Sequence, residues 1–464
     1  MSGSSNNNPS LLADTIAAIA TPLGEGGIAM IRLSGPRSIG IAGAAFQPLG
    51  PSSLAPTSAP THTIHYGRIL RGGRVIDDVL LSVLRAPRTF TREDVVEITC
   101  HGGLLTAKLV LDAVLEQGAR LAEPGEFTRR AFLHGRIDLA QAEAVADLIH
   151  ARTDLAAAAA REQLDGHLSR RINLLRDDLM KILAHVEAHI DFPDEDIAPD
   201  TQLKLLERLR KAVGFMDDLL RTANEGRLLR RGVRAGIVGR PNVGKSSLLN
   251  QLLGHDRAIV SPIPGTTRDT IEETASVRGL PVVFIDTAGL RETTDEIEVE
   301  GVRRSRGVLA SAELILHVLD GSEPLSNGDE KLWEEFAGKK RLLIRNKADL
   351  PQRLQLPAGL HAISLSCATG EGLEDLKDAI QEMLCAGGIH AEMLQVMVNS
   401  RHEDALRRAR SAATRAEEAL RQGAGLELVA LDLRQAANAV GEIVGKTTTE
   451  DLLDSIFSQF CLGK

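Results

Sequence analysis

Aromatic residues are scarce in this sequence: they make up 3% of the 464 residues, with a single Trp and a single Tyr. The interior must therefore be built from Leu, Ile, Val and Ala, a composition that favours helices. Cysteine is also rare, and Cys100, Cys367, Cys385 and Cys461 lie far apart with no Cys-x-x-Cys spacing. We therefore expect neither a disulfide framework nor a cysteine metal site, and a reducing compartment fits.

Long apolar runs and targeting signals are missing as well. No uninterrupted run of about 18 apolar residues occurs, so we expect no membrane-spanning helix. The first ten residues are polar, Asp14 interrupts the first apolar stretch, and no basic segment precedes it. We therefore expect no signal peptide and predict a cytoplasmic protein.

The chain also lacks an excess of basic residues. Its formal net charge of −9 argues against a protein that coats nucleic acid without regard to sequence, because such binding needs clustered Lys and Arg to neutralise the phosphates. A local basic run does occur, at Arg227, Arg230, Arg231 and Arg234. It is either a basic face or a solvated stretch of linker, and the second reading is the more common one.

Three kinds of sequence pattern follow one another along the chain, which is long enough for two or three domains. Short β-like runs alternate with turns over residues 16–126, helical periodicity follows over 127–223, and strands and helices alternate over 233–384. After residue 392 the helical pattern returns. We predict a multidomain fold: an N-terminal α+β domain, and a helical domain interrupted by an inserted α/β domain. Two separate helical bundles are the alternative. The predicted segments are 1–126, 127–226, 227–386 and 387–464, of which the second and fourth are the two halves of the helical domain.

A glycine-rich loop opens the predicted α/β domain. The sequence GRPNVGKSS follows a short apolar strand, Val233–Val238, and precedes an apolar helix. Gly239, Gly244, Lys245 and Ser246 match the pattern G-x-x-x-x-G-K-[ST] in the strand–loop–helix setting that it requires. Glycines let backbone N–H groups surround the phosphates, the lysine reaches the outer ones, and the serine hydroxyl binds Mg²⁺. We predict a Ras-like P-loop domain.

Two later motifs are suited to the metal and the γ-phosphate. IPGTTRDT contains Thr267, a second hydroxyl able to reach Mg²⁺ when the γ-phosphate is present. We expect this loop to order with the triphosphate and to relax after hydrolysis. VVFIDTAG is a predicted buried strand that brings Asp286 to the outer shell of the metal and Gly289 to the γ-phosphate.

The last two motifs select the base. LLIRNKAD ends in Asn346, Lys347 and Asp349, and a carboxylate there accepts the N1–H and 2-amino hydrogens of guanine, a donor pair that adenine lacks. SLSCATG resembles a guanine loop, with Cys367 as a packing residue rather than a nucleophile. Five motifs in this order predict a GTPase. The predicted GTP-binding residues are Asn242, Val243, Gly244, Lys245, Ser246, Ser247, Ser261, Pro262, Ile263, Pro264, Gly265, Thr266, Thr267, Asp286, Thr287, Ala288, Gly289, Asn346, Lys347, Asp349, Ser366, Cys367 and Ala368.

The DTAG turn is followed by Leu290, where many GTP-cleaving proteins have a glutamine that aligns the attacking water. The site therefore needs another group to orient water, and an added cation could supply positive charge. Asn242 in the glycine-rich loop is suited to hold a monovalent cation through its amide oxygen. The alternative is an asparagine that is merely tolerated in a tight turn.

The whole chain resembles the MnmE (TrmE) family of tRNA-modification GTPases. The resemblance rests on GRPNVGKSS, GTTRD, DTAGLRE, NKAD and the terminal FCLGK, in this domain order. It implies K⁺ bound by Asn242, Thr266 and the carbonyls of Ser261 and Ile263, with two GTPase domains meeting face to face. It further implies that Glu298 orients the attacking water; from the residues alone, Glu298 is one of several acids in a solvated loop.

The resemblance also implies a folate site in a dimerising N-terminal domain. The ligand is a one-carbon tetrahydrofolate (5-formyl- or 5,10-methylene-tetrahydrofolate), and the matching positions are Arg32, Glu97, Arg136 and Lys464. Arg136 stands where some family members have lysine. An apolar face on the last helix would dock the tail and bring Cys461 and Lys464 to the folate; a frayed tail with an incidental thiol is the alternative. That face consists of Leu452, Leu453, Ile456, Phe457 and Phe460.

By this resemblance we expect GTP hydrolysis, with Mg²⁺ and K⁺, to drive addition of an aminomethyl-type group at C5 of the tRNA wobble uridine. The expected partner is the FAD-dependent MnmG (GidA), in a heterotetramer or larger complex with the homodimer, without a membrane. A ribosome-associated GTPase switch would need an RNA-binding signature, and neither an RRM nor a KH pattern is present. A membrane remodeller would need a basic amphipathic helix, which the acidic balance does not favour.

Overall fold

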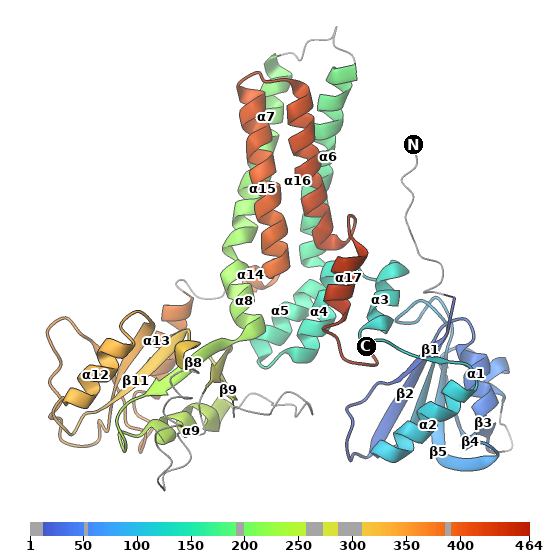
Figure 1. The fold of residues 1–464 in the computed structure, drawn as a ribbon, viewed down its shortest axis with the longest axis horizontal. Coiled ribbons are helices and arrows are strands. Elements are labelled where there is room, and N and C mark those ends of the chain that lie inside the picture. The colour runs from blue at the N-terminus through green and yellow to red at the C-terminus, as the bar shows by residue number, and fades with distance from the viewer. Residues whose placement is uncertain (1–12, 51–53, 192–198, 257–271, 286–308, 386–390) are drawn as a thin grey trace. The chain divides into compact units, whose positions relative to one another are not determined.

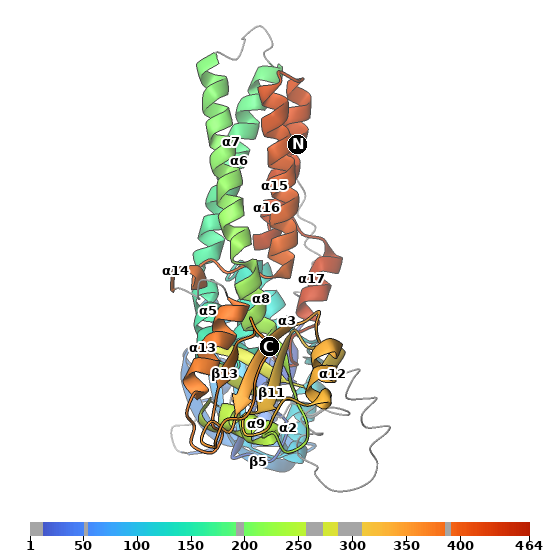
Figure 2. The ribbon, with the colours of Figure 1, turned by 90° about the vertical axis from the view of Figure 1, so that its left-hand side faces the viewer.

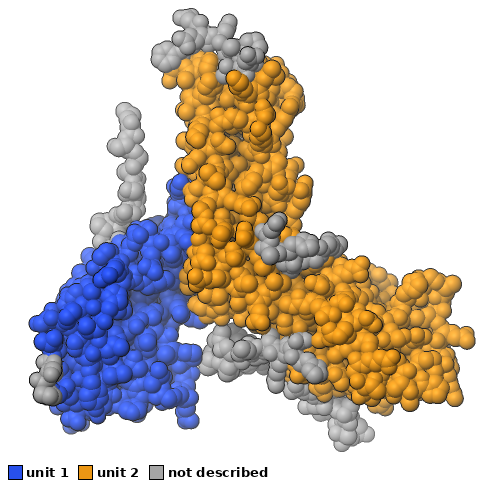
Figure 3. All heavy atoms as spheres, turned by 180° about the vertical axis from the view of Figure 1, so that it is seen from behind, with its two compact units in different colours: residues 1–143, 444–464 blue, residues 144–443 orange. Residues whose placement is uncertain are grey.

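The structure is a computed structural model that describes residues 13–50, 54–191, 199–256, 272–285, 309–385 and 391–464 (Figure 1). The chain forms two compact units, coloured separately in Figure 3. One contains residues 1–143 and 444–464, and the other contains residues 144–443. No helix in the described ranges is long and apolar enough to cross a membrane.

The first unit is built on a seven-stranded sheet in the order β3-β4-β5-β6-β2-β1-β7, antiparallel except for the β1–β7 pair. Apolar and polar residues alternate along β2 and β6, so Ile31 and Ile98 enter one core while their neighbours Arg32 and Glu97 belong to the opposite face. The strands are β1 (Ile16–Ile19), β2 (Ile28–Ser34), β3 (Phe46–Pro48), β4 (Thr63–Arg71), β5 (Arg74–Leu84), β6 (Val95–His101) and β7 (Arg120–Leu121).

Helices pack on both faces of this sheet, but they leave large apolar residues of β4 and β5 exposed on one of them. α1 (Ser38–Ala45) and α2 (Leu104–Glu116) close the main core, and a short 3₁₀ turn, Pro56–Ser58, packs on α1. On the other face, α3 (Glu126–Leu133) places Phe127 in a small cluster with Ile16. The late helix α17 (Glu450–Phe457) packs on α3, so residues from both ends of the chain share one unit.

The second unit contains a bundle of four long helices, which both Figure 1 and Figure 2 show side by side. They are α6 (His167–Asp191), α7 (Pro199–Arg221), α15 (Ser400–Arg421) and α16 (Leu426–Val444). The buried residues of α6 recur every three or four positions, which makes one apolar stripe. Because α7 packs against both α6 and α15, the helices before and after the inserted domain form one bundle. The alternative of two separate bundles is wrong.

The inserted domain has a six-stranded sheet in the order β13-β12-β11-β8-β10-β9, in which only β9 is antiparallel to its neighbour. Its core strands are continuous apolar runs, as expected for a sheet covered on both faces. The strands are β8 (Val233–Val238), β9 (Glu273–Val277), β10 (Leu280–Phe284), β11 (Leu314–Asp320), β12 (Lys340–Asn346) and β13 (Ala362–Ser364). The helices are α9 (Lys245–Asp256), α12 (Asn327–Glu335) and α13 (Leu373–Leu384).

Four shorter helices complete the second unit: α4 (Leu139–His150), which begins in the first unit, α5 (Asp154–Leu164), α8 (Ala223–Arg231) and α14 (Ala391–Leu394). α8 leads directly into β8, so the inserted domain begins where the helical segment ends. The predicted fold class is confirmed. The individual limits at residues 126, 226 and 386 stay predictions.

Candidate functional site

The glycine-rich loop joins β8 to α9. Gly239, Asn242 and Gly244 have φ values of 151°, 62° and 100°, so the backbone turns three times through conformations that most residues avoid. A Cβ on Gly239 would lie 2.4 Å from the Val318 carbonyl oxygen, which requires glycine there. Asn242 is exposed, and its φ is one that asparagine tolerates better than most residues. The turn conformation by itself accounts for an asparagine, and a role of Asn242 in holding a cation stays a prediction.

Lys245 is the first residue of α9. Its Nζ donates hydrogen bonds to the carbonyl oxygens of Gly239, at 2.9 Å, and Arg240, at 2.8 Å. Burial lowers the pKa of this half-buried ammonium group. Ser246 and Ser247 follow in the first turn of α9, where the helix dipole and the unpaired N–H groups favour an anion. The arrangement is that of a phosphate-binding loop.

Asn346, at the end of β12, ties three segments together. Its Nδ2 donates to the Val243 carbonyl at 2.7 Å, and its Oδ1 accepts from the Cys367 N–H at 3.1 Å. The side chain is buried, so it fixes the phosphate loop against the loop that follows β13. A Cβ on Gly244 would lie 2.2 Å from Asn346 Nδ2, which explains why glycine stands there.

Lys347 and Asp349 follow on the same loop. Lys347 has a φ of 63°, and its Nζ is paired with the carboxylate of Asp320. Burial alone would raise the pKa of Asp320, but hydrogen bonds from Lys347 and Ser322 lower it. Asp349 is exposed, and its Oδ1 accepts from the Ser366 hydroxyl at 2.6 Å. The carboxylate is thus oriented by a buried serine.

Cys367 lies beside this carboxylate. Burial, and next the charge of Asp349, raise the pKa of its thiol to about 11. Its carbonyl oxygen accepts from Gln251 Nε2 on α9 at 2.9 Å. A thiol so far from ionisation is a packing group, as the sequence indicated.

Many predicted positions lie outside the described residues. These are the second magnesium hydroxyl, the γ-phosphate turn, three of the potassium positions and the predicted water-orienting acid: Ser261, Pro262, Ile263, Pro264, Gly265, Thr266, Thr267, Asp286, Thr287, Ala288, Gly289 and Glu298. In the described ranges, no group of three or more His, Cys, Asp or Glu side chains is arranged to hold a metal.

The first unit brings together Arg32, Glu97 and the chain's last residues. Arg32 and Glu97 are register partners on β2 and β6, and their side chains form an ion pair of 2.9 Å. Arg32 Nη1 also donates to the Gly463 carbonyl at 3.3 Å. Burial lowers the pKa of Lys464 and Arg32 lowers it further, while Cys461 and Glu97 oppose the shift. Three of the four predicted folate positions therefore meet at one place.

Arg136 has other partners. Its Nη1 donates to the Thr89 carbonyl at 3.0 Å, and its guanidinium lies over the Phe90 ring at 5.7 Å from the centroid. Neither of these two contacts involves Arg32, Glu97 or the tail. Its role in binding folate stays a prediction.

The tail is docked rather than frayed. Leu453, Ile456, Phe457 and Phe460 are buried, and Leu452 is partly buried. The Gly125 N–H donates to the Cys461 carbonyl at 3.4 Å. Gly463 has a φ of 87°, and a Cβ there would lie 2.5 Å from the Ile19 carbonyl oxygen. The thiol of Cys461 is exposed.

A partly buried ion network near the tail was not anticipated from the sequence. Arg130, only 1% exposed, bonds Glu126 at 3.0 Å, Asp14 at 2.6 Å and Glu93 at 3.2 Å. Arg120 pairs with the same Glu126 at 2.6 Å. Since Asp14 and Arg130 lie 116 positions apart, no local pattern could have indicated the pair.

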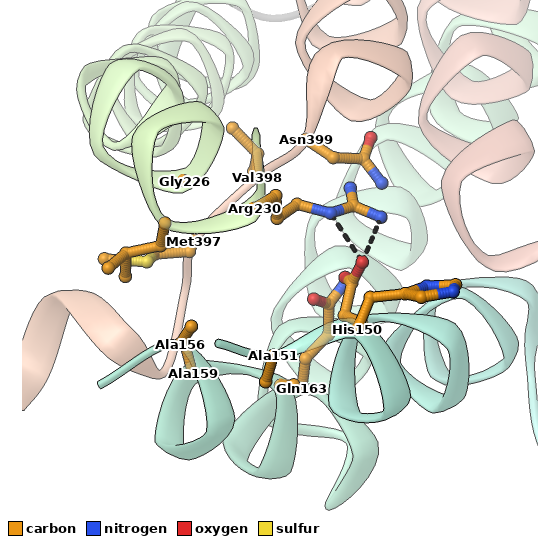
Figure 4. Close-up of a pocket in the computed structure, with 13 residues that line it drawn as sticks. His150, Ala151, Ala156, Ala159, Gln163, Gly226, Arg230, Met397, Val398 and Asn399 are labelled. Carbon is orange, nitrogen blue, oxygen red and sulfur yellow. Dashed lines mark hydrogen bonds and ion pairs between the residues drawn. The ribbon is translucent and has the colours of Figure 1, made fainter. Parts of the chain in front are cut away.

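A small cavity of about 40 Å³ lies between α4, α5, α8 and residues 397–399 (Figure 4). Arg230 and Asp147 form an ion pair of 2.7 Å at its edge, and Gln163 lines it. The cavity has room for a few water molecules at most and is lined by no residue of the phosphate loop. It is therefore not the candidate site. Arg234 is likewise paired, with Glu272 at 3.1 Å, so two of the four arginines in the basic run have acidic partners.

Two protein-family models match this chain. The family model of the MnmE helical domain matches residues 139–461, and that of the GTP-binding protein TrmE N-terminus matches residues 15–136. The chain belongs to the MnmE family. The tRNA modification GTPase MnmE of Bacillus velezensis is 49% identical over 460 residues, covering 97% of this chain and 100% of its own length. The MnmE proteins of Geobacillus kaustophilus and Bacillus subtilis are 49% and 48% identical, each over 97% of this chain and 99% and 100% of their own lengths.

Proposed function

We propose that this member of the MnmE family binds GTP between the Gly239–Ser247 loop and the loops at Asn346–Asp349 and Ser366–Ala368, and hydrolyses it to drive tRNA modification. The observation that carries the proposal is the position of Asn346. One buried amide bonds both the phosphate loop and the guanine loop, so the two ends of a nucleotide site are held at a fixed separation. Asp349, oriented by Ser366, supplies the acceptor that distinguishes guanine from adenine.

We propose that two cations bind at this site. The N-terminal turn of α9 presents Ser246, a hydroxyl ligand of the kind Mg²⁺ takes, and Thr267 is proposed as the second. We propose that K⁺ is held by Asn242, Thr266 and the carbonyls of Ser261 and Ile263. Asn242 is exposed and lies in a left-handed turn. When bound, the cations supply positive charge against the phosphoryl oxygens. Glu298 is proposed to orient the attacking water, and a second copy of the domain is proposed to complete the site.

The first unit is proposed to bind a one-carbon tetrahydrofolate beside the tail. Arg32 and Glu97 offer a paired donor and acceptor, the group types that bind an amide-like pterin edge or a carboxylate. Lys464 adds a half-buried amine at the same place, and Arg136 and Cys461 are further candidates. With an FAD-dependent MnmG (GidA) partner, in a heterotetramer or larger complex, the one-carbon unit would supply the aminomethyl-type group at C5 of the wobble uridine of tRNA in the cytoplasm.

We propose that the first unit dimerises through β4 and β5, on the sheet face opposite the main core. Ile64, Tyr66 and Leu80 are 67%, 53% and 46% exposed on β4 and β5, and Tyr66 and Leu80 are register partners. Large apolar side chains gathered on adjacent strands favour a protein–protein contact. The four proposed segments (1–126, 127–226, 227–386 and 387–464) then divide the work into folate binding and dimerisation, a helical connector in two halves, and GTP hydrolysis.

A contact between α5 and the β9–β10 hairpin supports coupling of the GTP cycle to the helical domain. Arg152 on the α4–α5 connection donates to the Thr274 hydroxyl at 2.9 Å, and a Cβ on Gly279 would lie 3.0 Å from the Leu155 side chain. In the sequence, this hairpin lies between the predicted Thr267 and Asp286 motifs. A displacement that follows hydrolysis would therefore be passed to α5.

The test is GTP hydrolysis by the full chain in K⁺ and in Na⁺ at equal ionic strength. We expect the wild type to hydrolyse GTP at least about tenfold faster in K⁺ than in Na⁺. A positive charge facing the phosphates raises kcat by about 10³–10⁵-fold where an arginine supplies it. Asn242→Ala should lose this K⁺ dependence, whereas Asn250→Ala, an exposed asparagine on α9, should keep it. Equal K⁺ stimulation of Asn242→Ala and wild type would refute the proposed ion site.

A further inference from the structure

Residues 320–329, between the end of β11 and the first turn of α12, contact both halves of the nucleotide site. At one end, the Asp320 carboxylate is paired with Lys347, and the Gly321 N–H donates to the Asn346 carbonyl at 2.9 Å. At the other end, Asp329 is bonded to Arg240, the second residue of the phosphate loop. We call this segment the 320–329 bridge. No motif of the sequence singles it out.

The Arg240–Asp329 pair is well formed and largely removed from water. Arg240 Nε lies 2.9 Å from Asp329 Oδ2 and 3.0 Å from Oδ1, and its Nη2 lies 3.2 Å from Glu323. The Asp329 side chain is only 1% exposed. A carboxylate buried to this degree needs a compensating charge, and Arg240 supplies it.

Asp329 is itself rigidly placed. It is the third residue of α12, and it forms a capping box with Ser326: its Oδ2 accepts from the Ser326 hydroxyl at 2.9 Å and from the Ser326 N–H at 3.2 Å. The methylene stem of Arg240 packs on the same turn, since a Cβ on Gly328 would lie 3.4 Å from Arg240 Cδ. Arg240 is therefore attached to a helix end rather than to a flexible loop.

Attachment at Arg240 acts directly on the groups that shape the phosphate loop. The carbonyl of Arg240 is one of the two that accept from Lys245 Nζ, and Asn242, two residues on, is held at a φ of 62°. This region costs a non-glycine residue free energy, although less for asparagine than for most, so the surroundings must hold Asn242 there. Fixing Arg240 thus fixes both the carbonyl that orients the lysine and the start of the strained turn.

We propose that Arg240, held by Asp329, is a positioning residue that sets the phosphate loop and the Lys245 ammonium group for binding of the nucleotide phosphates. The proposal rests on the GTP site proposed above. The competing explanation is that Asp329 serves only to cap α12 and that Arg240 merely neutralises it. The two explanations predict different nucleotide affinities for two kinds of variant. One kind breaks the Arg240–Asp329 ion pair and keeps the Ser326 cap, and the other weakens the cap and keeps the ion pair.

The experiment measures the Kd of the full chain for a fluorescent GDP analogue with Mg²⁺, together with the thermal unfolding midpoint. Arg240→Met keeps the stem and the cap but removes the ion pair, and we expect the Kd to rise about ten- to a hundredfold, the scale of a small misplacement in a preorganised site. Arg240→Lys, which keeps the charge without the forked geometry, should recover part of the affinity. Ser326→Ala weakens the cap and keeps the pair, so it should lower the unfolding midpoint and leave the Kd within about twofold.

Two results would overturn the proposal: a wild-type Kd for Arg240→Met, or a rise for Ser326→Ala as large as that for Arg240→Met. Should Arg240→Met fail to fold, Asp329→Asn replaces it as the test. The amide still caps α12 but no longer forms an ion pair with the Arg240 guanidinium. An unchanged Kd for Asp329→Asn would then refute the positioning role. Failure of the wild type to bind GDP would instead refute the proposed GTP site itself.

Discussion

The two candidate sites of this protein are assembled in different ways. In the nucleotide site, Asn346 at the end of β12 bonds Val243 and Cys367, which lie in the loops that follow β8 and β13, and these three strands belong to the parallel part of one sheet. In the folate candidate site, Arg32 bonds Gly463 across 431 positions of sequence. Parallel topology brings the carboxyl ends of strands to one edge of the sheet, so motifs that directly follow these strands lie close together in the fold. A site completed by a docked tail depends instead on packing and on charges that no regular pattern places.

The bonding of the two sites differs as well. Asn346 makes neutral hydrogen bonds to backbone groups, whereas the tail lies beside the Arg32–Glu97 ion pair and above α3, which is fastened by the Arg130 network. The nucleotide site also contains ion pairs, Lys347 with Asp320 and Arg240 with Asp329, so pH acts on both sites. We therefore expect single substitutions, rather than acid alone, to affect one site and leave the other unchanged.

The largest effect should come from Asp349→Asn in the nucleotide site. The carboxylate is proposed to accept two hydrogens of guanine, and a hydrogen bond to a charged group contributes about 1.5–3 kcal/mol. GTP affinity should fall at least about a hundredfold, and affinity for xanthosine triphosphate should rise, since an amide can donate to the 2-oxo group. Competition for a fluorescent nucleotide measures both.

Asp375→Asn, an exposed acid on α13, is the matched control and should leave both affinities unchanged. Folate binding should also be unaffected by Asp349→Asn. A parallel loss of folate affinity would show that the two sites are not built independently.

A smaller effect is expected from Glu126→Gln in the first unit. Burial raises the pKa of Glu126, but hydrogen bonds from Arg120, the Glu123 N–H and Arg130 lower it below its usual 4.5. A carboxyl whose pKa is lower in the folded state stabilises the fold above its unfolded pKa, and this contribution is lost as the pH falls through the folded value. At pH 7 the substitution should lower the opening free energy of α3 by about 2 kcal/mol, measured by hydrogen exchange.

The difference between Glu126→Gln and wild type should shrink as the pH is lowered below 4.5. Asp165→Asn, which removes an exposed pair with Arg161, is the control and should change nothing measurable in α3. A constant difference between pH 7 and pH 3 would mean that the carboxylate charge is not what stabilises this helix.

The smallest effect should come from Gly463→Ala. Gly463 has a φ of 87°, and the added methyl would collide with the Ile19 carbonyl, so the tail should dock less firmly. A left-handed conformation costs a non-glycine residue about 1–2 kcal/mol, which corresponds to roughly tenfold weaker folate binding. Equilibrium dialysis with 5-formyl-tetrahydrofolate measures it.

Gly359→Ala provides a close control for Gly463→Ala. Gly359 has a φ of 88° but no atom within 4 Å of an added Cβ. It should share the backbone strain and leave folate affinity unchanged. Equal folate affinity of Gly463→Ala and wild type would show that the docked tail takes no part in folate binding.

The sequence predicted the features that depend on local pattern. The strand–loop–helix around Lys245, the guanine loop at Asn346 and the apolar face of α17 all follow from spacing within about ten residues, and the structure places each of them on the expected element. The interrupted bundle followed from helical periodicity on both sides of the α/β segment. The folate positions came from family resemblance alone.

What could not be predicted depends on partners distant in the chain. Arg240 and Asp329 are 89 positions apart on different elements, and Asp14 is 116 positions from Arg130. Long flexible side chains pair according to the final packing, and their spacing in sequence carries no period. Arg136 shows the same limit, because its contacts with Thr89 and Phe90 arise from a loop that the helical pattern around it does not specify.

The unequal surroundings of the four cysteines make the protein convenient for spectroscopy. Burial raises the pKa of the thiols of Cys100, Cys367 and Cys385 to about 11, while Cys461 is exposed on the docked tail. A maleimide dye or spin label should therefore attach at a single position without prior mutagenesis. Its signal would follow release of the chain's end in real time, while nucleotide is added or folate is displaced.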